Sequence, residues 1–267
     1  MEAFSMKYVF LLLIMLASSG QAQTWRESQE VAKLFDEAGL DGTFVVLDPQ
    51  ADTLTGHDEA RAHTRFIPAS TFKIPNSLIG LASGAVASAD EVLPYGGQPQ
   101  PFPQWEKDMS LREAIPISNV PIYQELARRI GLSRMQEYVT RLGYGNADIG
   151  TQVDQFWLQG PLKISAVEQT QFLYRLTQGA LPVPPTVQAT VREMVLLEQG
   201  DGWALYGKTG WAMGQDPEVA WWVGWVTRGD AVYPFALNIT VRDTKDGEKR
   251  IPTGKAALRA LGILPAP

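Results

Sequence analysis

The stretch PASTFK, residues 68–73, places Ser70 three residues before Lys73 at the start of a segment with helical apolar spacing. Residues three apart on a helix share a face, so the serine hydroxyl and the lysine amine should lie together. The lysine can accept the serine proton only as a neutral amine, and burial among flanking residues such as Phe66 and Ile74 would lower its pKa. A Ser-x-x-Lys pair alone carries little weight, because about one is expected by chance in a chain of this length.

Outward from this stretch, apolar residues at helical spacing predict helices through the middle of the 267-residue chain. A capping-box pattern, Ser165 followed by Glu168, opens one of them. The other expected helices cover residues 24–38, 70–81, 111–115, 121–130, 132–142, 187–197 and 251–261, the last with Pro252 near its start.

Strand-forming residues occur towards both ends of the chain. Residues 42–48 read as a strand, with a turn and a return strand at 53–55, and residues 203–208, 219–226 and 232–241 are rich in β-branched and aromatic side chains. We expect the two ends to join in one antiparallel sheet with a helical region inserted between them. This predicts an α+β fold of three layers, αβα, without separate domains.

A second motif, Ser118-Asn119-Val120, follows a helical segment and precedes Pro121. Its hydroxyl could pass a proton between a lysine and a leaving group. Serine is also preferred as a helix N-cap, so the motif alone leaves both roles open.

The third motif, Lys208-Thr209-Gly210, lies on an expected strand and occurs once in the chain. Lysine and threonine at a strand edge suit an anionic ligand, and glycine allows close approach of another backbone. An exposed strand end is the alternative interpretation.

Composition excludes several kinds of site. The chain has no cysteine, which rules out disulfides, thiol nucleophiles and thiolate metal sites. Its two histidines, His57 and His63, are too few for the usual catalytic zinc site and lie in a polar stretch typical of a solvated loop. We therefore expect neither a bound metal nor a prosthetic group. The net charge is −6 with no Lys/Arg cluster among aromatic residues, so we expect no nucleic-acid partner either.

Residues 1–22 are typical of an export signal. Lys7 precedes nine apolar residues, 8–16, which are too few to span a bilayer, and small residues ending at Ala22 suit a cleavage site. A buried strand or helix is the alternative. Export would leave residues 23–267 as a periplasmic catalytic domain without a membrane anchor, as a monomer or a homodimer.

With its three motifs in this order, the chain resembles the class D, or oxacillinase-type, serine β-lactamases over nearly all of residues 23–267. The Tyr-Gly-Asn and Phe-Trp-Leu stretches distinguish this class from class A. The stretches that carry the resemblance are PASTFK (68–73), SNVP (118–121), YGN (144–146), FWL (156–158), KTGW (208–211) and WWVGW (221–225).

The resemblance implies a fold of the serine β-lactamase and transpeptidase type and hydrolysis of β-lactam antibiotics, hence resistance, through an acyl-enzyme on Ser70. It implies that Lys73 reacts with CO₂ or bicarbonate and, once carboxylated, acts as general base. By the same resemblance Trp157 would hold the carbamate through its indole N–H, with Val120 and Leu158 as an apolar cover. A core tryptophan and ordinary packing are the alternatives for these three residues.

The resemblance also assigns the substrate-binding residues. The backbone N–H groups of Ser70 and Trp211 would form the oxyanion hole. Lys208, Thr209 and Arg250 would bind the substrate carboxylate. Gly210 would contribute to substrate binding by allowing close approach to the strand. A small shift in the alignment of the motifs would assign the role of Arg250 to a neighbouring lysine, Lys249 or Lys245. Tyr144 could relay a proton or have a purely structural role.

Two other functions share these motifs. A penicillin-binding transpeptidase or carboxypeptidase uses the same serine and lysine but lacks a deacylating carbamate. A β-lactam sensor domain binds the antibiotic covalently and barely turns over. Steady-state turnover separates all three.

Overall fold

A seven-stranded sheet forms the centre of the computed structural model, which describes residues 23–266. The expected export signal, residues 1–22, lies outside the described residues. The strand order is β1-β3-β2-β9-β8-β7-β6, so strands from the two ends of the chain meet where β2 pairs with β9. Every neighbouring pair is antiparallel except β1 and β3, which are parallel at one edge.

The described residues form the following elements. The sheet contains β1 (Thr24–Glu27), β2 (Gly42–Asp48), β3 (Thr53–His57), β6 (Leu196–Gly200), β7 (Trp203–Ala212), β8 (Glu218–Arg228) and β9 (Ala231–Val241). A small hairpin pairs β4 (Val92–Leu93) with β5 (Met109–Ser110). The helices are α1 (Gln29–Ala38), α2 (Glu59–His63), α3 (Lys73–Ala82), α4 (Leu111–Ala114), α5 (Val120–Ile130), α6 (Leu132–Leu142), α7 (Ala166–Thr177), α8 (Pro185–Met194) and α9 (Thr244–Ala260), with 3₁₀ turns η1 (Ala69–Phe72) and η2 (Pro103–Trp105).

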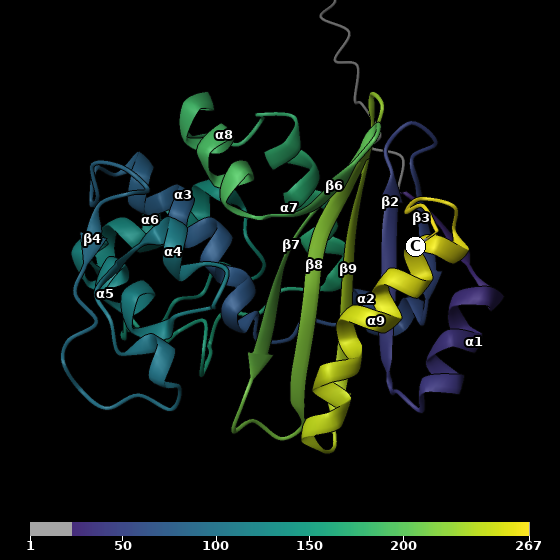
Figure 1. Ribbon diagram of the computed structural model, residues 1–267, viewed down its shortest axis with the longest axis horizontal. Helices are drawn as coiled ribbons and strands as arrows, with labels where there is room; N and C mark the ends of the chain where they lie inside the picture. Colours follow the sequence, from purple (N-terminus) through teal and green to yellow (C-terminus); the bar gives the residue numbers. More distant parts are fainter. Residues whose placement is uncertain (1–22, 267) are drawn as a thin grey trace, which may run out of the picture.

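Helices cover both faces of the sheet, which confirms the three-layer α+β prediction (Figure 1). Side chains alternate between the faces along each strand. Trp221 and Val223 of β8 join the core that includes α3, α5 and α7, whereas Trp222 joins the core beneath α1 and α9. The inserted region, from α2 to α8, therefore lies against one face and the two terminal helices against the other.

Three local predictions were wrong. The expected helix at 24–38 begins only after Ser28, whose hydroxyl accepts from Val31 N at 3.3 Å, and Thr24–Glu27 is a strand parallel to β3. Leu196 and Leu197 are not helical but belong to the edge strand β6. Helix α9 begins at Thr244 after the N-cap Asp243, not at Ile251, so Pro252 lies in its interior. The first turns were missed because they are charged and carry no apolar stripe. The two histidines, expected in a solvated loop, lie in regular secondary structure: His57 at the end of β3 and His63 at the end of α2.

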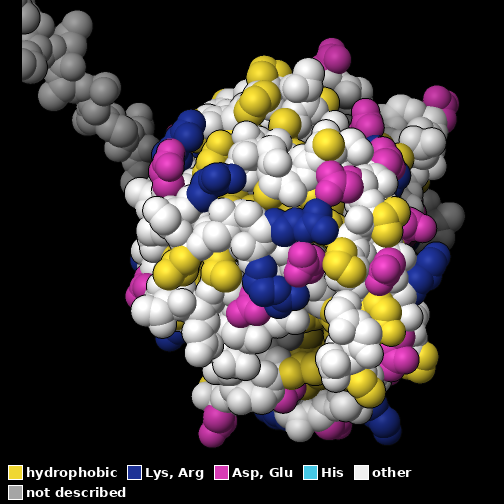
Figure 2. Space-filling model, turned by 90° about the vertical axis from the view of Figure 1, so that its left-hand side faces the viewer, with side chains coloured by type: hydrophobic (Ala, Val, Ile, Leu, Met, Phe, Trp, Pro, Cys, Tyr) yellow, Lys and Arg dark blue, Asp and Glu magenta, His cyan; other side chains and the backbone are white. Residues whose placement is uncertain are grey.

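The face formed by the inserted helices carries charges of both signs, interspersed rather than gathered (Figure 2). Arg128 pairs with Asp154 at 2.8 Å, and Arg129 pairs with Glu91 at 2.9 Å and Glu125 at 3.0 Å. Such pairs leave no continuous basic surface on this face. Among the described residues, no helix combines the length and apolarity needed to cross a membrane.

Candidate active site

Ser70 and Lys73 form the centre of the site. Ser70 lies in η1 and Lys73 opens α3, so one helical turn brings the two side chains together. The Lys73 amine donates a hydrogen bond to Ser70 Oγ over 2.8 Å. Lys73 is fully buried, and this burial, aided by the nearby charge of Lys208, holds its pKa well below the ordinary value. Burial therefore favours the neutral amine, whose lone pair can accept the serine proton.

The turn that presents Ser70 is held against β7. Ala69 has a φ of 48°, in the left-handed region that alanine rarely occupies. Gly210 of β7 packs so close that a Cβ there would lie 2.8 Å from the Pro68 carbonyl oxygen and 3.2 Å from Thr71 N. The glycine of the third motif thus allows the strand to approach the nucleophile's turn.

Ser118 is joined to Lys208 and does not cap α5. Lys208 Nζ donates to Ser118 Oγ over 2.9 Å, while the N-cap of α5 is Asn119, whose side chain accepts from Ile122 N at 3.1 Å. Ser118 has a φ of 57°, so its backbone is also in the left-handed region. Of the two roles left open by the motif, the structure excludes the cap and leaves the hydroxyl in contact with the site.

Beyond Gly207, the edge of β7 is not covered by β6. Gly207 N donates to Val195 O on the β6 side at 2.8 Å, and backbone groups alternate sides along a strand. Thr209 and Trp211 therefore direct their backbone groups to the same open edge, as the bond from Lys208 Nζ to Thr209 O at 2.9 Å illustrates. This edge packs against η1, so the Trp211 N–H faces the region of Ser70.

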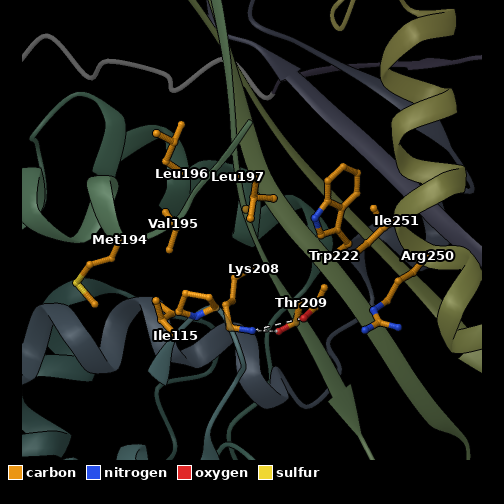
Figure 3. Close-up of a pocket in the computed structure, with 12 residues that line it drawn as sticks. Ile115, Met194, Val195, Leu196, Leu197, Lys208, Thr209, Trp222, Arg250 and Ile251 are labelled. Atoms are coloured by element: carbon orange, nitrogen blue, oxygen red, sulfur yellow. Dashed lines mark hydrogen bonds between the residues drawn. The ribbon is translucent and has the colours of Figure 1, made fainter. Parts of the chain in front are cut away.

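A cavity of about 260 Å³ continues from this edge and is lined by Lys208, Thr209 and Arg250 (Figure 3). Burial and the Arg250 charge lower the pKa of Lys208 to about 7. The alternatives to Arg250 point elsewhere: Lys249 Nζ donates to Ala38 O at 3.0 Å, and Lys245 is exposed. The cationic end of the cavity therefore suits an anionic group.

Trp157 packs against Phe72, the residue just before Lys73. Its ring stacks on that of Phe72, with centroids 5.6 Å apart, and its side chain is fully buried. The Trp157 Nε1 group is buried without a hydrogen-bond partner. An unpartnered indole N–H is costly in a protein interior, so this donor indicates a missing acceptor.

The remaining predicted residues surround these groups. Val120 opens α5 and Leu158 follows Trp157, and both are half-buried. Tyr144 is fully buried and donates to Gln169 Oε1 at 3.3 Å, while burial raises the pKa of its hydroxyl. Glu168 keeps its predicted capping-box bonds with Ser165.

Several residues at the site were missed by sequence reasoning. Ile115, Leu196, Leu197, Trp222 and Ile251 line the cavity beside Lys208 (Figure 3). Apolar residues within helices and strands resemble ordinary core residues, so their sequence carried no signal. The left-handed Ala69 was equally hidden, because alanine does not mark such a conformation.

Comparison with known proteins agrees with this geometry. The penicillin binding protein transpeptidase domain family matches residues 42–259. Beta-lactamase OXA-5 from Pseudomonas aeruginosa is 41% identical over 250 residues, 92% of each chain, and beta-lactamase OXA-48 from Klebsiella pneumoniae is 37% identical over 92% of this chain and 93% of its own. The crystal structure of FUS-1 (OXA-85), a class D β-lactamase from Fusobacterium nucleatum subsp. polymorphum, superposes with a TM-score of 0.87 at 42% identity, covering 90% of this chain and all of that one. With the three motifs gathered at one edge of the same fold, the chain belongs to the class D β-lactamase family.

Proposed function

We propose that the protein hydrolyses the β-lactam ring of penicillin-type antibiotics through an acyl-enzyme on Ser70, and thereby confers resistance. The observation that carries the proposal is the fully buried Lys73 amine, which lies 2.8 Å from Ser70 Oγ and whose pKa is lowered by burial. A serine hydroxyl becomes nucleophilic when a group beside it can take its proton.

Acylation uses the surrounding groups in turn. Ser70 Oγ attacks the lactam carbonyl and loses its proton towards the Lys73 position. The backbone N–H groups of Ser70 and Trp211 stabilise the developing oxyanion. The ring C–N bond then breaks, and Ser118, which accepts from Lys208, delivers a proton to the departing nitrogen.

The substrate carboxylate binds at the cationic end of the cavity. Lys208, Thr209 and Arg250 line it together, and the positive charges of Lys208 and Arg250 raise the energy of the empty site. An anionic ligand relieves this repulsion, so a carboxylate fixes the lactam ring relative to Ser70.

The residues around Lys73 fit a covalently bound CO₂. Only a neutral amine reacts with CO₂, and Trp157 Nε1 is a buried donor that lacks an acceptor. As a carbamate on Lys73, CO₂ supplies an anionic general base for acylation and for deacylation by water. Trp157 would hold it, and the half-buried Val120 and Leu158 would limit the entry of water.

The test compares the parent with Ser70→Ala. Incubation with a penicillin should add the mass of one antibiotic to the parent on a peptide containing Ser70, and nothing to the variant. Steady-state turnover should be fast in the parent and absent in the variant. An adduct on Ser70→Ala would contradict the assignment.

Turnover also separates the two other functions that share the motifs. A transpeptidase-like enzyme or a β-lactam sensor would form the adduct on Ser70 but release it slowly. The unpartnered Trp157 donor favours the hydrolase, because only that function requires an anion on Lys73.

We further propose that residues 1–22 are removed on export and that residues 23–267 form the periplasmic enzyme. The intact mass of protein recovered from the periplasm should correspond to a chain starting at or near Gln23. A chain that retains Met1 would contradict this proposal.

A further inference from the structure

The carbonyl of Pro68 precedes one of the two left-handed backbone positions described in the site. Ala69, with its φ of 48°, separates this carbonyl from Ser70. A left-handed alanine reverts to a relaxed conformation unless its neighbours hold it. The contacts that fix the Pro68 peptide therefore decide where the Ser70 hydroxyl and N–H lie.

Three hydrogen bonds run in one direction towards that carbonyl. The Tyr144 hydroxyl donates to Gln169 Oε1 over 3.3 Å, and Gln169 Nε2 donates to Thr71 Oγ1 over 2.9 Å. The Thr71 hydroxyl donates to Pro68 O over 2.8 Å. We call Tyr144, Gln169 and Thr71 the buried relay.

Burial makes the relay directional. Tyr144, Gln169 and Thr71 are each at most 1% exposed, so water does not compete for their polar atoms. Gln169 occupies the Thr71 oxygen as acceptor, which leaves the Thr71 proton free to point at Pro68 O. In a low-dielectric interior, bonds arranged head to tail strengthen one another.

Other contacts fix the chain just before the Pro68 carbonyl. Trp221 Nε1 donates to Ile67 O at 2.9 Å, and Phe66 pairs with Ile164 through two backbone bonds. Among the residues that the structure describes, the only other donor to Pro68 O is Thr71 N, at 3.2 Å. The Thr71 hydroxyl is thus the shorter of the two bonds that hold this peptide.

We infer that Gln169 is a positioning residue for the nucleophile, acting through Thr71 on the strained turn at Ala69. The inference rests on the proposed reaction at Ser70. Gln169 touches neither Ser70 nor the cavity, so its loss should slow the chemistry without removing a group that contacts the substrate.

The experiment measures the acylation rate constant by stopped flow with a penicillin, together with KM and thermal unfolding. Gln169→Met removes the amide at similar size, and Thr71→Val removes the hydroxyl at similar shape. Each should slow acylation by about tenfold to a hundredfold, as expected for a small misplacement of a reacting group, with little change in KM. The double variant should be no slower than the slower single variant, because both changes break one relay.

Two further variants separate positioning from stability. Thr71→Ser restores the hydroxyl and should restore most of the acylation rate. Gln188→Met is the matched control: Gln188 is fully buried and donates to the carbonyls of Gly179, Leu181 and Val183, away from Ser70. It should lower the melting temperature but leave acylation unchanged.

Parent-like acylation in a folded Gln169→Met variant would overturn the inference, and so would equal slowing by Gln188→Met. If Gln169→Met does not fold, the acylation rates of Thr71→Val and Thr71→Ser test the relay, and a parent-like rate in Thr71→Val would contradict it. A parent protein that forms no Ser70 adduct would instead refute the proposed function, so the two failures are distinguishable.

Discussion

Lys208 is a residue whose charge at neutral pH depends on its surroundings. Burial first and the Arg250 charge second lower its pKa to about 7, from 10.5. As the pH rises through this value, the free protein loses the positive charge that meets the substrate carboxylate. We predict that penicillin binding to the unreactive Ser70→Ala variant weakens above about pH 7, as measured by calorimetry.

Arg250→Ala provides the matched comparison. Removing the neighbouring charge raises the pKa of Lys208, so the alkaline loss of binding should move to higher pH even though binding is weaker throughout. A loss of binding at the same pH in both proteins would show that another group titrates. Exposed Lys245→Ala should change neither the pH dependence nor the affinity.

Trp157 allows a test of its single polar atom. Trp157→Phe keeps the stacking partner of Phe72 but removes the unpartnered Nε1 donor. If that donor holds an anion on Lys73, deacylation should slow by about a hundredfold or more, as on loss of one oxyanion-hole donor, and the acyl-enzyme should accumulate. Trp225→Phe, which alters a buried tryptophan stacked on Tyr206, should reduce stability only. Unchanged burst and turnover in Trp157→Phe would identify it as a core residue.

At the scale of elements, the site depends on how closely β7 meets η1. Gly210→Ala would place a methyl group 2.8 Å from Pro68 O and 3.1 Å from Thr71 Cγ2, so the strand or the turn must shift. We predict a loss of kcat/KM of about a hundredfold or more, because a shift of this size displaces the Trp211 N–H from Ser70. Gly56→Ala is the control: its methyl group would also meet a backbone oxygen, that of Phe44, but between β2 and β3, far along the sheet. It should destabilise the fold while the surviving protein keeps its kcat.

The sequence predicted most elements because their apolar spacing and caps are local. Strand β2 and helix α6 match their expected bounds, and the capping box at Ser165 opens α7. Strand β1 was missed because a helical stripe starting at Val31 was extended backwards over Thr24–Glu27, where pairing with β3 decides the conformation. A parallel partner distant in sequence leaves no local signal.

The sequence predicted those residues of the candidate site that belong to short motifs. Ser70 and Lys73 lie at hydrogen-bond distance, as their spacing had indicated, whereas the bond between Lys208 and Ser118 was not predicted as a pair. Motifs do not predict the left-handed backbone conformation of Ala69. They also do not predict the hydrogen bond from Gln169 to Thr71, which lies 98 positions away in sequence. A glutamine within a helix reads as a surface residue, and only the tertiary fold brings it behind the nucleophile.

At the scale of the whole molecule, folding and the chemistry of Lys73 are linked. An unfolded lysine keeps its proton to about pH 10, whereas burial and the Lys208 charge hold the pKa of the folded Lys73 well below that value. Between these two pKa values the unfolded chain binds more protons, so this group makes the free energy of unfolding rise with pH. Acidification across this interval reverses that gain, and below the lowered pKa, where Lys73 is charged in both states, the group adds no further pH dependence.

CO₂ adds to this linkage, because only the folded chain buries Lys73 and so favours the neutral amine with which CO₂ reacts. We predict that bicarbonate at constant pH raises the melting temperature, since a ligand that binds only the folded state stabilises it by mass action. Labelled bicarbonate should give one ¹³C carbamate signal that is lost in Lys73→Ala and kept in Lys249→Ala, whose lysine is partly exposed. Mild acid should remove the signal and the activity together, and bicarbonate at neutral pH should restore both. A protein that turns over penicillin at full rate without bicarbonate, and shows neither the signal nor the rise in melting temperature, would require an amine base at Lys73 and a different acceptor for the Trp157 N–H.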